Sequence, residues 1–224
     1  MYGYSVCGIL LLAAYATQTY GLKTVSPGTN AFLTSVYCVI VPFMAWGIFR
    51  KRPTPYNWAA AVLCIAGIGM ISLSGDLSVG AGEALTLLSG LLYALHIMAL
   101  SHFGRQDDPI ALTVVQFAFT ALLAWICTLA VEQGAAFPAP ASWPQLMYLT
   151  VFATAVTLIC QSVGQSLTPP SQSAILLSLE SVFGVFFSVL MGREDLTLQL
   201  ICGFALIFIS VIISETQLSF LKHK

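Results

Sequence analysis

Glu180 is the residue of this sequence best suited to chemistry, because it lies at the middle of an apolar segment, residues 171–191. An ionised carboxylate at the centre of a bilayer costs at least about 2.5–3.5 kcal/mol. We therefore expect a protonated Glu180 at rest that releases its proton when a cation or water arrives, as proton coupling requires. The alternative is a neutral Glu180 that only fixes helix packing, on a face shared with the small residues Gly184 and Ser188.

His96 is the second candidate and lies at the middle of residues 81–103, on a helical face that also carries Ser89 and Tyr93. A buried histidine near a carboxylate can relay protons at physiological pH. A neutral histidine bonded to a hydroxyl fits the pattern equally well. No HExxH or other metal-ligand spacing accompanies it, so we expect neither a metal site nor a cofactor.

Polar side chains in other apolar segments complete the candidate site. Gln116 and Gln161 carry primary amides, which in hydrocarbon need partners from another helix or a wet cavity. Asn30 and Tyr37 form a further polar stripe with Thr34. The predicted substrate- or proton-binding residues are Glu180, His96, Tyr93, Gln116, Gln161, Tyr37 and Asn30.

The amino-acid composition indicates that these apolar segments lie in a lipid bilayer. Hydrophobic residues make up 58% of the chain and charged residues 8%, against about 25% charged residues in soluble domains. The net charge of −1 gives no electrostatic case for nucleic-acid binding. All six cysteines lie in apolar runs without CxxC spacing, which favours buried packing roles over disulfide or metal chemistry. No GxSxG, HExxH or phosphate-loop motif occurs, so we do not expect an enzyme.

Eight segments are long and apolar enough to cross a bilayer as helices. They are residues 3–22, 30–49, 56–74, 81–103, 109–131, 145–167, 171–191 and 198–218. If the loop at 50–55 is cytoplasmic, the same side holds Arg50, Lys51, Arg52, Arg105, Lys222 and Lys224, and the other side holds only Lys23 and Arg193. This bias predicts that both termini are cytoplasmic, and we expect the protein to lie in the plasma membrane.

The chain also matches itself without a gap at an offset of 143 residues, as from Gln18 to Gln161. Further identical pairs include Gly21 with Gly164, Pro27 with Pro170, Phe43 with Phe186, Arg50 with Arg193 and Leu63 with Leu206. The offset maps the first three predicted spans onto the last three, so the repeat is five spans long. An odd number of spans makes the two copies inverted relative to each other.

The repeat predicts an all-α integral membrane protein of two inverted five-helix repeats. Eight helices of a ten-helix parent are expected here, without the first two. Residues 1–75 are then the last three helices of the first repeat, residues 80–218 are the complete second repeat, and residues 219–224 are a cytoplasmic tail. The offset also makes Tyr37 the counterpart of Glu180, and we expect the two to face each other near the midplane.

Two stretches resemble the EamA family of the drug/metabolite transporter superfamily. Residues 21–34, GLKTVSPGTNAFLT, are similar to the family's third-to-fourth helix segment. Residues 176–183, LLSLESVF, followed by Gly192, Arg193 and Glu194, are similar to its ninth helix. Two departures are Ser181 in place of a usual proline, which would straighten the helix, and the insertion of Arg193. The resemblance implies a secondary transporter for small metabolites, coupled to an ion or substrate gradient.

Two functional hypotheses follow. The first is an EamA-type transporter of a small metabolite or drug-like solute, proton-coupled through Glu180. The second is a truncated, non-transporting remnant or a subunit that needs a partner. No Lys or Arg lies inside a predicted span, which disfavours phosphorylated anions and favours neutral, zwitterionic or weakly cationic solutes. The expected partners are this solute and the lipid bilayer, and homodimerisation is left open.

Overall fold

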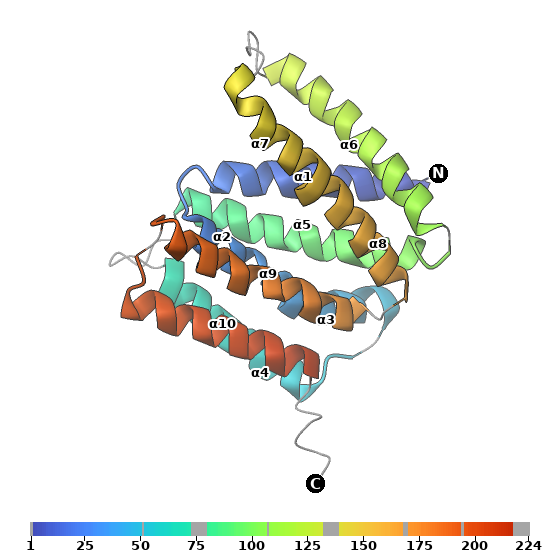
Figure 1. Cartoon of the computed structure of the whole chain (residues 1–224). Coiled ribbons are helices and arrows are strands. Elements are labelled where there is room, and N and C mark those ends of the chain that lie inside the picture. Colours follow the sequence, from blue (N-terminus) through green and yellow to red (C-terminus); the bar gives the residue numbers. More distant parts are fainter. Residues whose placement is uncertain are drawn as a thin grey trace. The chain divides into compact units, whose positions relative to one another are not determined.

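Every regular element that the structure describes is a helix. The computed structural model describes residues 2–50, 52–72, 80–106, 108–131, 139–167, 170–193 and 195–216. Its elements are α1 (Tyr2–Gly21), α2 (Pro27–Thr34), α3 (Tyr37–Phe49), α4 (Pro55–Ser72), α5 (Ala81–Phe103), α6 (Pro109–Val131), η1 (Pro140–Ser142), α7 (Trp143–Tyr148), η2 (Leu149–Val156), α8 (Thr157–Leu167), α9 (Pro170–Leu190) and α10 (Leu198–Thr216). The all-α fold predicted from the sequence is confirmed (Figure 1).

Helix length and composition make this a multi-pass membrane protein. Within the described residues, four helices are long and apolar enough to cross a bilayer: Pro27–Ile48, Ala81–Phe103, Pro109–Ala130 and Pro140–Leu167. Shorter apolar helices cover Pro55–Ile71, Leu179–Leu190 and Leu198–Ser214. The count of eight spans stays a prediction. The expected tail, residues 219–224, lies outside the described part of the chain, together with Lys51 and Glu194.

Two predicted spans have internal irregularities. Residues 30–49 divide into α2 and α3, where the backbone N–H groups of Val36 and Cys38 donate to carbonyls three residues earlier, those of Leu33 and Ser35. The span at 145–167 begins at Trp143 and contains a π-helical stretch, η2. There the Thr157 hydroxyl donates to Phe152 O at 2.9 Å. By contrast, α9 is one uninterrupted helix through Ser181, as expected for a chain that lacks proline at this position.

The chain divides into two compact units that do not coincide with the sequence repeats. One unit comprises Met1–Leu12 and Ala99–Pro169, and we call it the α6–α8 unit. The other comprises Ala13–Met98 and Pro170–Lys224, and we call it the α2–α9 unit. Helices α1 and α5 contribute residues to both.

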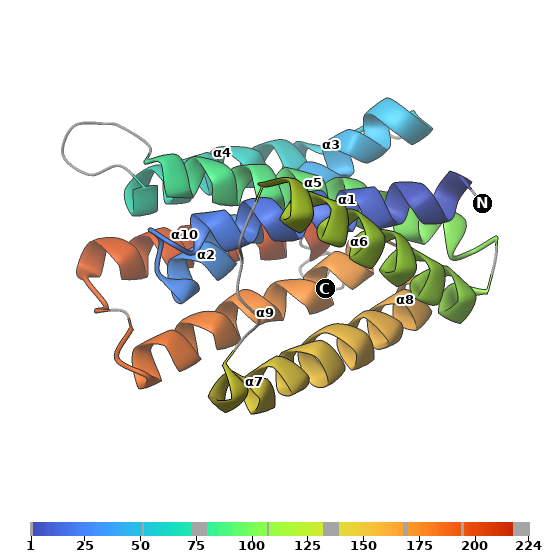
Figure 2. The same ribbon diagram turned by 90° about the horizontal axis from the view of Figure 1, so that it is seen from above.

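Close backbone contact holds α4 against α10 in the α2–α9 unit, and these helices lie side by side in both ribbon views (Figures 1 and 2). A Cβ atom built on Gly67 would lie 2.9 Å from Gly203 O, and one on Gly203 would lie 3.1 Å from Gly67 O. The Asn57 amide donates to Ser214 O at 3.1 Å and to Ser214 Oγ at 3.2 Å. Small residues at the crossing let the backbones approach, as is common between membrane helices.

The α2–α9 unit also contains the packing that positions α9. Helix α9 contacts α2, α3 and α10. Phe32 of α2 stacks on Phe204 of α10 with a centroid separation of 4.4 Å. A second core contains Tyr37, Cys38 and Val41 of α3. Leu177 of α9 packs against this core, so α9 is fixed on the α2–α3 segment close to Glu180.

The α6–α8 unit has a smaller core of Cys7, Leu100 and Leu112. Two hydrogen bonds join its helices. Thr120 of α6 donates to Gly8 O of α1 at 3.0 Å, and Thr113 of α6 donates to Ser162 Oγ of α8 at 2.6 Å. Cys7, Cys38 and Cys64 are buried, as expected from the sequence. Cys127, Cys160 and Cys202 are exposed on the surface of the protein instead.

Candidate functional site

A directed chain of side-chain hydrogen bonds crosses α5, α1 and α2 in the α2–α9 unit. The Tyr93 hydroxyl donates to Gln18 Oε1 at 2.7 Å. Gln18 Nε2 in turn donates to Asn30 Oδ1 at 3.2 Å and to Thr34 Oγ1 at 3.4 Å. Because each donor already has an acceptor, the orientations of both amides and of the Tyr93 hydroxyl are fixed together.

The chain ends on a helix backbone. Asn30 Nδ2 donates to Thr86 Oγ1 at 2.8 Å, and Thr86 Oγ1 donates to Gly82 O at 2.8 Å. Asn30 is 2% exposed and Thr86 is fully buried. A buried amide without partners would be costly, so this set of bonds explains how Asn30 is accommodated inside the unit.

Glu180 lies on the side of α9 that faces α2 and α3. Leu177, one turn before it, packs against the Tyr37 core. Gly184, one turn after it, lies so close to α2 that a Cβ atom there would be 2.8 Å from Ala31 Cβ. Because residues three or four apart share one helix face, Glu180 belongs to this contact face. The Glu180 side chain is nevertheless exposed.

Three tyrosines from three helices interact electrostatically with the Glu180 carboxylate. They are Tyr15 of α1, Tyr37 of α3 and Tyr93 of α5. The rings of Tyr15 and Tyr93 also meet edge to face, with centroids 6.2 Å apart and an interplanar angle of 71°. Tyr93 of α5 and Leu177 of α9 both pack against the core that contains Tyr37, the counterpart of Glu180 in the repeat.

Asn30, Tyr37, Tyr93, His96 and Glu180 all belong to the α2–α9 unit. His96 is 1% exposed and lies one turn after Tyr93 on α5. Hydrogen bonds join Tyr93 to Asn30 through Gln18, and Tyr93 packs against the core that contains Tyr37.

The two predicted glutamines belong to the α6–α8 unit. Gln116 is fully buried on α6, one turn beyond Thr113, whereas Gln161 is only half-buried on α8. Gln165 is the more buried glutamine of α8, at 2% exposure. It lies one turn beyond Ser162, which accepts the bond from Thr113. Helical spacing on α8 alone does not distinguish Gln161 from Gln165.

Sequence reasoning missed Gln18 and Tyr15, although a signal for both was present. The repeat offset pairs Gln18 with Gln161, which was a candidate, so the same argument applied to Gln18. Tyr15 precedes Gln18 by three residues and therefore shares its helix face. Within the described residues, no group of three or more His, Cys, Asp or Glu side chains is placed to hold a metal ion.

Comparison with known proteins identifies one family. The model of the EamA-like transporter family matches residues 2–73 and 80–216. An uncharacterized transporter of Archaeoglobus fulgidus is 32% identical over 208 residues, which cover 92% of this chain and 66% of the relative. The uncharacterized transporter YwfM of Bacillus subtilis is 26% identical over 166 residues, which cover 66% of this chain and 52% of the relative. The chain thus spans between about half and two thirds of these proteins.

A solved structure supports the fold alone. The crystal structure of another protein matches this chain with a TM-score of 0.68 and 16% sequence identity. The match covers 97% of this chain and 77% of the other chain.

Proposed function

The chain belongs to the EamA-like transporter family, and from this premise we propose that it is a secondary transporter of a small metabolite or drug-like solute, proton-coupled through Glu180. The observation that carries the proposal is the position of Glu180 on the face of α9 that packs against α2 and against the Tyr37 core, which Tyr93 of α5 also contacts. A site built from several helices can change when those helices move. We assign no enzymatic activity to it.

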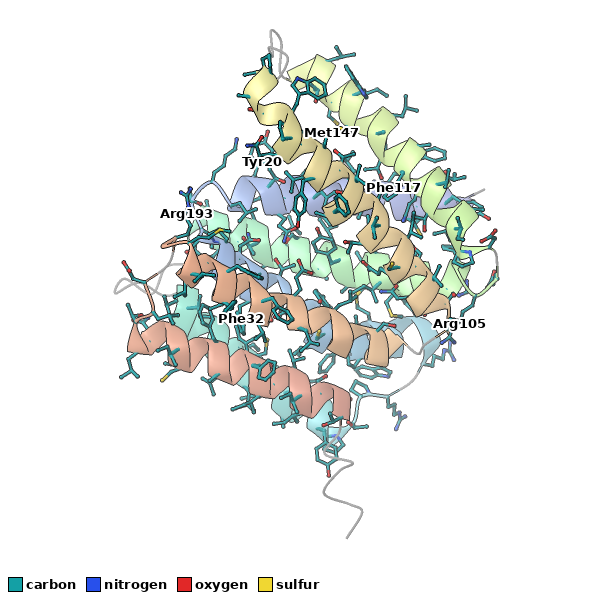
Figure 3. All side chains as sticks on the ribbon, viewed as in Figure 1. Tyr20, Phe32, Arg105, Phe117, Met147 and Arg193 are labelled. Carbon is teal, nitrogen blue, oxygen red and sulfur yellow. The ribbon has the colours of Figure 1, made fainter. Side chains whose placement is uncertain are left out.

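Proton coupling follows from the position of Glu180 in an apolar helix without fixed positive charge. Within the helices as the structure bounds them, no Lys or Arg occurs. Arg105 and Arg193 both lie beyond helix ends (Figure 3). An acidic side chain inside a membrane segment is typical of proton relays in transporters. The proposal places the protein in the plasma membrane with both termini in the cytoplasm, on the distribution of Lys and Arg.

The test is solute efflux from cells or liposomes that contain the protein, with and without an imposed pH gradient. We expect the gradient to accelerate efflux of at least one solute from a panel of neutral, zwitterionic and cationic metabolites. Glu180→Gln should abolish this acceleration. The matched control is Glu83→Gln, because Glu83 lies in the first turn of α5 in the same unit. Gradient-driven efflux that persists in Glu180→Gln would refute the coupling role.

A second candidate function is a partner-dependent or non-transporting membrane subunit. The chain spans 66% and 52% of its two described relatives. Transport measurements on the purified chain, reconstituted in liposomes, distinguish the two candidates. Gradient-driven transport by the purified chain alone contradicts the second candidate, whereas transport that appears only when an additional membrane subunit is supplied contradicts the first.

A further inference from the structure

A buried amide in the α6–α8 unit is not part of the hydrogen-bonded chain in the α2–α9 unit. Gln165 of α8 is 2% exposed, and neither its Oε1 nor its Nε2 has a hydrogen-bond partner among the described residues. An amide buried without partners is costly, because it gives up its hydrogen bonds to water. A partner from outside the chain would supply the missing bonds.

Gln165 lies on the face of α8 that packs against α6. The buried residues of α8 are Leu158, Ser162 and Gln165, and their spacing places them on one helix face. Ser162 accepts a hydrogen bond at 2.6 Å from Thr113, in the first turns of α6. Helix α8 lies beside this end of α6 in both ribbon views (Figures 1 and 2). Gln165 is one turn beyond Ser162 and therefore belongs to this contact.

The neighbouring hydroxyls are bonded to other groups and not to this amide. The Thr113 hydroxyl forms hydrogen bonds of 2.7 Å with Pro109 O and 2.6 Å with Ser162 Oγ. The hydroxyl of Ser166, the next residue in the chain, donates to Val163 O at 2.7 Å. The amide is therefore left beside polar groups that already have partners of their own.

The fold itself does not require an amide at this position. The repeat offset of 143 residues pairs Gln165 with Leu22, whereas it pairs Gln161 with Gln18. The amide one turn before Gln165 thus occurs in both repeats, and the amide of Gln165 occurs in the second repeat alone. A buried polar residue that departs from the shared pattern indicates a function of the second repeat.

The chemistry of a primary amide selects the ligand. Its oxygen accepts hydrogen bonds and its nitrogen donates them. A carboxylate offers only acceptors and would leave Oε1 unbonded, and an ammonium group offers only donors and would leave Nε2 unbonded. Neither α6 nor α8 contains a charged residue, so an ion between them would also be costly. A neutral carboxamide carries a donor next to an acceptor and can form both bonds at once.

We propose that Gln165 is the recognition residue of a binding subsite for a neutral carboxamide group between α6 and α8. Its Oε1 accepts a hydrogen bond from the ligand N–H, and its Nε2 donates one to the ligand carbonyl, so that the two amides form a cyclic pair. The inference rests on the transporter function proposed above in one respect, namely that this carboxamide belongs to the transported solute.

Movement of α8 away from α6 gives the ligand access to this amide. Cys160 and Leu167 lie on the opposite face of α8 and are exposed. Immediately before α8, the stretch η2 is π-helical, and such stretches in helices frequently occur at functional sites. Separation of the two helices breaks the bond between Thr113 and Ser162 and exposes Gln165.

Titration calorimetry of the purified full chain in detergent tests the proposal with three ligands of similar size. Benzamide carries a donor and an acceptor, acetophenone has a methyl group in place of the amide nitrogen, and benzoate has a charged oxygen there. Because both hydrogen bonds form only with benzamide, we expect it to bind at least about fivefold more tightly than either analogue. Equal affinities, as expected if only water bonds to Gln165, or no saturable benzamide binding in the millimolar range would overturn the proposal.

A pair of variants assigns the preference for benzamide to Gln165. Gln165→Leu introduces the residue that the other repeat carries at this position, and benzamide and acetophenone should then bind equally. Gln145→Leu is the matched control, because Gln145 is an exposed amide on α7, and it should keep the preference. A preference that persists in Gln165→Leu contradicts the assignment. The comparison of the three ligands on the unaltered chain does not depend on whether a variant folds.

Failure of this inference is distinguishable from failure of the proposed function. Gradient-driven efflux of a solute, without selective binding of benzamide, would retain the transporter and remove the carboxamide subsite. Selective benzamide binding that depends on Gln165, without gradient-driven movement of any solute, would retain the subsite and remove the transport function.

Discussion

The hydroxyl of Tyr93 on α5 donates a 2.7 Å hydrogen bond to Oε1 of Gln18 on α1. This bond connects the two parts of the candidate site. Tyr93 interacts with Glu180, and Gln18 leads through Asn30 to Thr86. The orientation of the Tyr93 hydroxyl therefore depends on a glutamine that does not itself need to touch the solute.

We predict that Gln18→Leu destabilises the chain. The substitution leaves the Tyr93 hydroxyl and Asn30 Oδ1 without their present partner, and an unsatisfied buried polar group costs about 1–3 kcal/mol. Thermal unfolding of the purified protein in detergent measures the loss of stability. Gln106→Leu is the control, because Gln106 is exposed after α5. Equal unfolding temperatures for the two variants would contradict the prediction.

We predict that Asn57→Ala loosens the contact between α4 and α10. Asn57 is 3% exposed and donates to Ser214 O and Ser214 Oγ. Its Oδ1 also accepts from the backbone N–H of Thr54 at 2.8 Å, at the start of α4. Loss of these bonds should cost about 1–3 kcal/mol. Ser214→Ala removes only the hydroxyl acceptor and should cost less, so a larger effect of Ser214→Ala would be inconsistent with this description.

We predict that Gly203→Ala is destabilising even though alanine is the better helix former. A Cβ atom at Gly203 would lie 3.1 Å from Gly67 O and 2.6 Å from Ile71 Cγ1. Overpacking of this kind typically costs about 1–3 kcal/mol. Gly47→Ala in α3 is the matched control, because a Cβ atom there meets nothing within 4 Å. It should be neutral or stabilising by about 0.5–1 kcal/mol. Similar unfolding temperatures for both variants would show that the close approach is not rigid.

Helix positions were readily predicted from the sequence, because apolar segments bounded by proline and glycine closely match most elements. Local features were harder to predict. The division between α2 and α3 lies at a short stretch of three-residue backbone hydrogen bonds around Val36, and the π-helical stretch η2 has no proline or glycine to mark it. Both arise from contacts that a hydropathy pattern does not contain.

The candidate site was predictable where one residue was chemically unusual. Glu180 stands out as a carboxylate inside an apolar segment, and the repeat offset associated it with Tyr37. Tyr15 and Gln18 are ordinary residues for a membrane helix, so their role emerges only when α1 is placed beside α5. For the same reason, spacing alone could not separate Gln161 from the more buried Gln165.

Solute efflux driven by a pH gradient tests the central claim most directly, because the claim assigns proton coupling to Glu180. Efflux is measured in liposomes that contain the unaltered chain, Glu180→Gln or Glu83→Gln. The account predicts that the gradient accelerates efflux in the unaltered chain and in Glu83→Gln, and that it has no effect in Glu180→Gln. Acceleration of unchanged size in Glu180→Gln would contradict the account.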